Sequence, residues 1–108
     1  MRGMSRAFCS FLVPVLILFA YTSETNANPY RGRILAQQWC AQCHGVGPNE
    51  LSADANAPSF SSIAREASAT EYALRVFLRT PHPTMPNFVL KPDDIDDLVS
   101  YIVSLRQD

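Results

Sequence analysis

The sequence Cys40-Ala41-Gln42-Cys43-His44 decides the fold and the chemistry of this chain. It follows the pattern C-x-x-C-H, in which the second thiol and the imidazole lie three and four positions after the first thiol. On a helix, side chains at that spacing share one face, so all three groups point to the same side. Two thiols placed there can bond to two vinyl groups of one porphyrin, and the adjacent imidazole can bind its iron. The motif therefore predicts covalent attachment of a c-type haem through Cys40 and Cys43, with His44 as an iron ligand.

Three other interpretations of the two cysteines need to be weighed. A thioredoxin-type redox pair lies at the end of a strand in a βαβ unit, and strand-like alternation is missing on both sides of this motif. A zinc site needs four ligands, yet only His82 remains as a further soft ligand, and neighbours such as Cys43 and His44 rarely both reach one metal. A structural disulfide across so short a loop would be strained. The pattern favours haem over all three.

The first 27 residues have the features of a secretory signal peptide. Arg2 and Arg6 give a positive start, residues 8–21 are almost continuously apolar, and Thr25-Asn26-Ala27 is a small-residue cleavage site. The apolar run is shorter than the ~20 residues that a membrane-spanning helix needs, and a proline interrupts it. We therefore expect residues 1–27 to be removed after Ala27, which leaves a periplasmic domain of residues 28–108 that does not span a membrane. A leader retained as an anchor is the alternative.

The composition of residues 28–108 limits the possible partners and sources of stability. This part of the chain keeps seven Lys+Arg and nine Asp+Glu, a formal net charge of −2. That balance, without a basic stripe, does not indicate nucleic-acid binding. Both remaining cysteines lie in the motif, so an exported domain this small has no cysteine left for a disulfide. A covalently held haem would supply a large apolar plate around which short helices can pack.

Two amphipathic segments at the ends of this domain are expected to cross. Asn28-Pro29 opens a helix that we expect to run to about Cys43, in which Gly32, Ala36 and Cys40 form a strip of small side chains. A second helix begins at Pro92, with four acidic residues interpreted as complementing its dipole and facing solvent. Its apolar positions, spaced i, i+3, i+4 and i+7, are Ile95, Leu98, Val99 and Ile102. We predict that it crosses the first helix at Gly32, with Tyr101 as a candidate contact.

The middle of the chain predicts two shorter helices and a stiff loop. One helix is expected over residues 59–66, and Ser68-Ala69-Thr70-Glu71 resembles a capping box for the next. Residues 80–88 carry three prolines, which remove backbone donors and fix φ, so they predict an extended loop. Met85 lies in that loop and is the only methionine after residue 27. Without any strand pattern, the sequence predicts an all-α domain of about four short helices around one haem.

These features together resemble the small class I c-type cytochromes of bacteria. The resemblance covers nearly all of residues 28–108 and rests on five features: CAQCH, Gly32 eight residues before Cys40, APSF at 57–60, TPHPTMPNF at 80–88, and LVSYIVSL at 98–105. It implies the class I cytochrome c fold, with thioethers at Cys40 and Cys43. It also implies His44 as the proximal iron ligand, Met85 as the distal ligand, and a backbone carbonyl near Pro58 that accepts the ring N–H of His44.

Met85 has one rival as the distal ligand, His82, three residues earlier in the same loop. A soft thioether favours ferrous iron and raises the reduction potential above that of a bis-imidazole site. His82 is flanked by two prolines and is most simply read as an exposed loop residue. We therefore favour Met85.

A protein that fills both axial positions leaves none open for oxygen or a substrate. The sequence also lacks a nucleophile–base or carboxylate pair that would indicate hydrolysis. It therefore predicts a monomeric one-electron carrier, not an enzyme, that works between a redox donor protein and an acceptor. A haem-bearing subunit of a larger dehydrogenase or oxidase is the main alternative. A haem sensor or peroxidase-like enzyme would need an open sixth position.

Overall fold

The computed structural model describes residues 26–107, in which all regular secondary structure is helical and no strand occurs. Its elements are α1 (Pro29–Trp39), α2 (Phe60–Arg65), α3 (Glu71–Arg79), α4 (Pro92–Ser104) and a 3-10 turn (Leu105–Gln107). The expected all-α class with about four short helices is confirmed. The expected signal peptide falls on residues 1–27, of which 1–25 lie outside the described residues. Within 26–107 no helix has the length and apolar character needed to cross a membrane.

Helix α1 begins where the sequence predicts but ends earlier. The Asn28 side chain accepts hydrogen bonds from the backbone N–H groups of Tyr30 and Arg31, and proline occupies the first helical position. The helix ends at Trp39, whereas the sequence predicted about Cys43. The end comes early because one carbonyl, that of Ala36, accepts from both Cys40 N and the next residue's N, at 2.8 and 3.0 Å. The haem-attachment motif therefore lies in a turn beyond the helix, not on its face.

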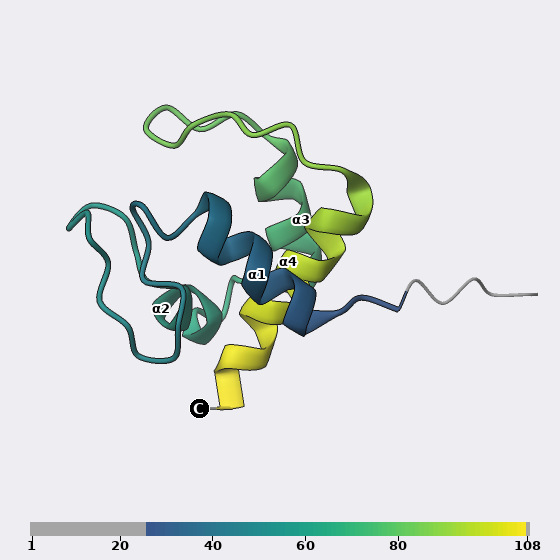
Figure 1. Cartoon of the computed structure of the whole chain (residues 1–108), viewed down its shortest axis with the longest axis horizontal. Coiled ribbons are helices and arrows are strands. Elements are labelled where there is room, and N and C mark those ends of the chain that lie inside the picture. Colours follow the sequence, from purple (N-terminus) through teal and green to yellow (C-terminus); the bar gives the residue numbers. More distant parts are fainter. Residues whose placement is uncertain (1–25, 108) are drawn as a thin grey trace, which may run out of the picture.

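Helices α1 and α4 cross in close contact, as Figure 1 shows. A Cβ atom added to Gly32 would lie 2.0 Å from the Asp97 carbonyl oxygen and 2.8 Å from the Tyr101 Cβ. Contacts that short do not occur between real side chains, so only glycine permits this approach. The predicted crossing at Gly32, with Tyr101 in the contact, is confirmed.

Helix α4 contributes more buried apolar residues to the core than any other element of residues 26–107. The four apolar positions expected on one face, Ile95, Leu98, Val99 and Ile102, are all at most 3% exposed. The expectation that its four aspartates face solvent is wrong for two of them. Asp94 and Asp97 are buried, and both accept hydrogen bonds from the Arg31 guanidinium of α1. A charge 63 residues distant along the chain cannot be recognised from the local pattern that suggested helix-dipole compensation.

The two short helices are capped by side chains. Ser59 accepts from Ser62 N at the start of α2, and Thr70 accepts from Ala73 N at the start of α3. The predicted capping box at residues 68–71 is therefore displaced by two positions. Ala69 N instead bonds to the Glu66 carbonyl at 3.1 Å, so the chain is still turning at the expected cap.

Two long connections complete the fold and reach the same side of the helices in Figure 1. Residues 40–59 join α1 to α2, and residues 80–91 join α3 to α4. The second connection contains no helix, as its prolines predicted. The C-terminal turn closes the core from the other side, because the Arg106 guanidinium donates to the carbonyls of Ala64 and Ala69.

Candidate cofactor site

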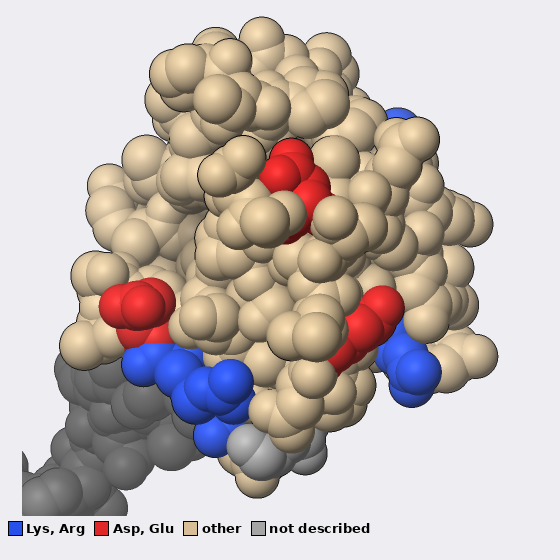
Figure 2. All heavy atoms as spheres, turned by 90° about the vertical axis from the view of Figure 1, so that its left-hand side faces the viewer, with Lys and Arg blue, Asp and Glu red and all other residues tan. Residues whose placement is uncertain are grey.

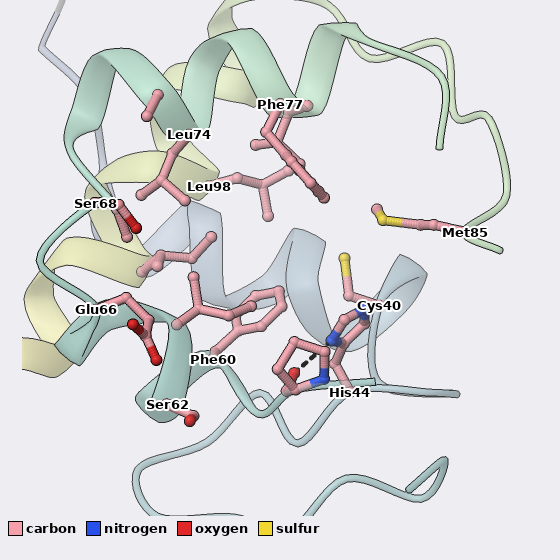
Figure 3. A pocket seen from close by; sticks show the side chains of 16 residues that line it. Cys40, His44, Phe60, Ser62, Glu66, Ser68, Leu74, Phe77, Met85 and Leu98 are labelled. Atoms are coloured by element: carbon pink, nitrogen blue, oxygen red, sulfur yellow. Dashed lines mark hydrogen bonds between the residues drawn. The ribbon is translucent and has the colours of Figure 1, made fainter. Parts of the chain in front are cut away.

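The motif residues lie in a tight turn directly after α1. The N–H groups of Cys43 and His44 both donate to the Cys40 carbonyl, at 3.2 and 2.9 Å. The second bond has the i to i+4 spacing of an α-helix, so the turn has a helix-like conformation although α1 has ended. Figure 3 shows Cys40 and His44 side by side at one wall of a cavity.

The cysteines do not have the properties of a redox pair or a zinc site. Both are free thiols, and burial raises the pKa of the Cys40 thiol to about 11. Thioredoxin-type pairs depend on a lowered thiol pKa, so the shift at Cys40 has the opposite sign. No group of three or more His, Cys, Asp or Glu side chains in residues 26–107 could hold a metal ion together. Neither alternative fits this geometry.

His44 is oriented by a backbone carbonyl. Its Nδ1 lies 2.6 Å from the Pro58 carbonyl oxygen. A carbonyl can only accept, so Nδ1 carries a proton and the nitrogen that could bind a metal is Nε2. The ring also packs at a tilt on Phe60, with 5.6 Å between the ring centroids. These two contacts fix the tautomer and the direction of the imidazole.

The loop that holds Pro58 beside His44 is closed by several hydrogen bonds. Gly45 lies at its centre: its N–H donates to Ser52 Oγ at 2.9 Å, and its carbonyl accepts from Phe60 N at 2.8 Å. A Cβ at Gly45 would lie 2.2 Å from the Glu50 carbonyl oxygen, so a side chain does not fit there. The Tyr101 hydroxyl donates to the Val46 carbonyl and fastens the loop to α4.

The cavity lies between the motif turn, α2, α3 and α4 and has a volume of about 400 Å³. Its walls are mainly the apolar side chains Phe60, Ile63, Ala69, Leu74, Leu98 and Ile102. A second cavity of about 450 Å³ adjoins it on the side of residues 82–86. His44, Cys40 and Met85 line both spaces, and Cys43 lines the second. Together they form one slot with apolar walls.

Met85 and His82 occupy different positions relative to this slot. Met85 extends from the 80–91 connection into the first cavity, across from His44 (Figure 3). His82 does not line the first cavity but lines the second, and its ring lies against Phe77 with 3.4 Å between centroids. Of the two candidate ligands, Met85 is the one that faces the wall carrying His44.

These residues fit a covalently attached haem. The slot offers apolar walls for a flat macrocycle, two thiols at one edge, and nitrogen and sulfur donors on opposite sides. His44 could bind iron through Nε2 and Met85 through its thioether, while Cys40 and Cys43 could carry the macrocycle. A slot of this kind has both the donors and the burial that haem proteins use to hold and tune the cofactor.

Sequence reasoning missed the aromatic residues of the site. Phe60 and Phe77 form walls of the slot, and Trp39 stacks on Phe88 at 6.4 Å with an interplanar angle of 13°. The stack joins the end of α1 to the 80–91 connection at the rim of the second cavity. The two residues are 49 positions apart, so only Trp39's place next to Cys40 could have suggested such a role.

The helical fold, the C-x-x-C-H turn and the facing methionine define the class of c-type cytochromes. Residues 27–102 match the family model described as cytochrome c oxidase, cbb3-type, subunit III. The chain is also similar to cytochrome c-552 of Bradyrhizobium diazoefficiens, with 41% identity over 85 residues, which cover 79% of this chain and 82% of that protein. The search of solved structures found no match. The chain belongs to the c-type cytochrome family that this model represents.

Membership of this family establishes the cofactor and the general activity. The protein is a monohaem c-type cytochrome with covalently bound haem c and its iron. It is an electron-transfer protein and not an enzyme. The expected class of fold, cofactor and function are thereby confirmed.

Proposed function

We propose that this cytochrome is an exported carrier that moves single electrons between a donor and an acceptor protein in the periplasm. In this proposal a signal peptide is cleaved after Ala27, and residues 28–108 act as a monomer. The leader pattern of residues 1–27 and the helix cap at Asn28 support it. The cap means that helix α1 begins directly after the expected cut.

The proposed site uses five residues. Cys40 and Cys43 would form the thioethers, His44 and Met85 would bind the iron, and the Pro58 carbonyl would orient His44. The observation that carries this assignment is the opposed placement of His44 and Met85 across an apolar slot (Figure 3). The 2.6 Å contact from Nδ1 of His44 to Pro58 supports iron binding through Nε2.

The protein's own groups adapt the site to electron transfer. The bound haem supplies a one-electron iron couple. The Met85 thioether favours the ferrous state and raises the potential, and the apolar walls favour it further because they disfavour net charge. His44 and Met85 would both hold the iron, so this chain would supply the same two ligands in both oxidation states. The reorganisation energy of such a site is small, and substrates have no free coordination position.

The surface near the slot supports contact with a protein partner. Figure 2 shows that the face reached by the two long connections is mostly uncharged, with isolated acidic and basic groups. The wider cavity at residues 82–86 is lined by one charged side chain, Asp54. A partner that docks there would be guided weakly by charge, so electron exchange should depend little on ionic strength.

A second function is favoured by the description of the matching family model, which names an oxidase subunit. In that case the protein would remain bound to a larger redox complex. Size-exclusion chromatography of the native periplasmic and membrane extracts separates the two. A haem signal at the size of a free monomer supports the carrier, and co-elution with a large complex supports the subunit.

The assignment of the site is tested by the exported protein itself. Acid–acetone extraction should leave the haem on the chain, and mass spectrometry should place it on a peptide containing Cys40 and Cys43. The intact mass should correspond to a chain that begins at Asn28. Haem removed by extraction would contradict the thioethers, and a chain that keeps residues 1–27 in the membrane fraction would contradict the proposed processing.

A further inference from the structure

The start of α1 is bound to α4 through two buried carboxylates. The Asn28 backbone nitrogen donates to Asp97 Oδ1 at 2.7 Å. The Arg31 guanidinium donates to Asp97 Oδ2 and to Asp94 Oδ1, each at 2.9 Å. The side chains of Asp94 and Asp97 are only 9% and 6% exposed. This cluster joins the two ends of the domain beside the crossing at Gly32.

The charges of this cluster do not balance among residues 26–107. One guanidinium faces two carboxylates, and no other cation in residues 26–107 lies within ion-pair distance of either. On the same helix Asp93 is exposed, and Asp96 is paired with Arg75 of α3 at 2.8 Å. A buried negative charge without a counter-charge is costly. The cluster therefore lacks one positive charge.

We propose that removal of the signal peptide supplies this charge, because it converts the Asn28 nitrogen into an α-ammonium that pairs with Asp97. The inference rests on the processing after Ala27 proposed above. Hydrolysis by the signal-cleaving peptidase breaks the Ala27–Asn28 C–N bond. Water gives its hydroxyl to the Ala27 carbonyl carbon, and the new carboxylate leaves with the leader. The nitrogen gains protons where it already lies, 2.7 Å from the carboxylate.

The position of the cut matters for this ion pair. Asn28 caps α1 through its side chain, and its carbonyl accepts from Gly32 N at 2.9 Å. A cut one residue later would remove that cap. A cut further upstream would leave an uncharged amide against Asp97. A cation at a helix N-terminus opposes the helix dipole, so the carboxylate is also needed to offset that repulsion.

The test is a double-mutant cycle on the exported, haem-loaded protein. Gly-Ser inserted between Ala27 and Asn28 gives a processed chain in which the Asn28 nitrogen remains an amide. We expect this extension to lower Tm by about 4–8 °C, which is the shift that a free-energy change of about 1 kcal/mol produces in a domain of this size. In the Asp97→Asn background the same extension should change Tm little. Asp93→Asn is the matched control, because it removes an exposed aspartate of the same helix and should keep the full effect of the extension.

The pH dependence provides a second measurement that does not require a variant of Asp97. The Asp97 carboxylate should raise the pKa of the α-amine above its ordinary value of about 7.7–8.0. A group with a raised pKa stabilises the folded state below its unfolded pKa and ceases to do so as pH rises through its folded pKa. The difference in Tm between processed and extended chains should therefore be full near pH 6–7 and disappear at alkaline pH.

Three results of these measurements would overturn the proposal. They are equal Tm values for the processed and extended chains, an effect of the extension that persists with Asp97→Asn, and a difference that does not change with pH. A native N-terminus other than Asn28 would also overturn it. The haem spectrum serves as the independent readout of the cytochrome function. If the spectrum is normal in the processed and extended chains, with and without Asp97→Asn, the cytochrome function stands even when the ion pair is disproved.

Discussion

The two sides of the haem slot position their proposed ligands in different ways. On the His44 side, the imidazole contacts a carbonyl, and the loop around it is closed by hydrogen bonds through Gly45 and by the Tyr101 hydroxyl. On the Met85 side, the only backbone hydrogen bond within residues 81–90 runs from Phe88 N to the Pro86 carbonyl. Three prolines and two ring contacts, those of His82 and Phe88, take the place of a hydrogen-bond network there.

This difference indicates that the two ligands are held with different strength. A network of hydrogen bonds fixes both the direction and the tautomer of His44. Prolines restrict the loop around Met85 in the unfolded as well as the folded chain, but they add no contact to the core. We therefore expect the His44 side to unfold only when the whole domain unfolds. The Met85 side should also open by local unfolding.

The largest effect is expected when both cysteines are replaced. Cys40→Ser with Cys43→Ser should leave the exported chain without haem and largely unfolded, because the remaining core is small. Circular dichroism and protease sensitivity measure the loss. The single replacement Cys43→Ser is the control, since one thioether can still hold the macrocycle. A cooperatively folded double variant would show that the hydrogen-bonded side is stable without its cofactor.

A smaller but global effect is expected at the helix crossing that supports the His44 side. Gly32→Leu should cost roughly 1–3 kcal/mol or more, since its side chain would meet the Asp97 carbonyl and push α4 away. Thermal or denaturant unfolding of the haem-loaded protein measures it. Gln37→Leu, at an exposed position of α1, is the matched control. Unfolding curves that agree for both variants would remove the close crossing from the account.

A local effect is expected on the Met85 side. Phe88→Ala removes the stack on Trp39, worth about 0.5–1.5 kcal/mol beyond area burial. We expect faster hydrogen exchange of the amides in residues 80–90, with little change at residues 44–60. Val89→Ala, at a fully exposed neighbour, is the control. If exchange increases equally on both sides of the slot, the two sides do not open independently.

The sequence predicted the parts of this fold that depend on local chemistry. Three features constrain the backbone in their own vicinity, so they could be predicted from the sequence: the haem motif, the proline loop and Gly32. The early end of α1 at Trp39 depends on how the Ala36 carbonyl is shared, which no periodicity reveals. The cap at Thr70 was missed because Ser68 offered an equally good pattern two residues earlier.

Contacts between distant segments escaped the sequence entirely. Arg31 pairs with Asp94 and Asp97, and Trp39 stacks on Phe88, because the fold brings residues 49 to 66 positions apart together. Periodicity showed which face of α4 is apolar but not which of its aspartates is buried beside a cation. The walls of the slot likewise needed the packing of α2 and α3, which their short sequences do not specify.

The smallest effect is expected at His82. His82→Ala removes a ring contact with Phe77 in a loop that already has few interactions. The reduction potential and the absorption spectrum should stay almost unchanged, because the imidazole does not line the first cavity, which His44 and Met85 both line. Potentiometry of the purified protein checks this. A large shift in potential would indicate that His82, and not Met85, contacts the iron.

The most direct test of methionine ligation is carbon monoxide binding to the reduced protein in four forms. The wild type and His82→Ala should bind little, since Met85 would still fill the sixth position. Met85→Ala should bind readily and show a lower potential, because the thioether is gone. Met85→His should stay closed to carbon monoxide but also have a lowered potential. If His82→Ala instead opens the iron while Met85→Ala leaves it closed, the distal ligand is His82 and the account of a methionine-ligated carrier is contradicted.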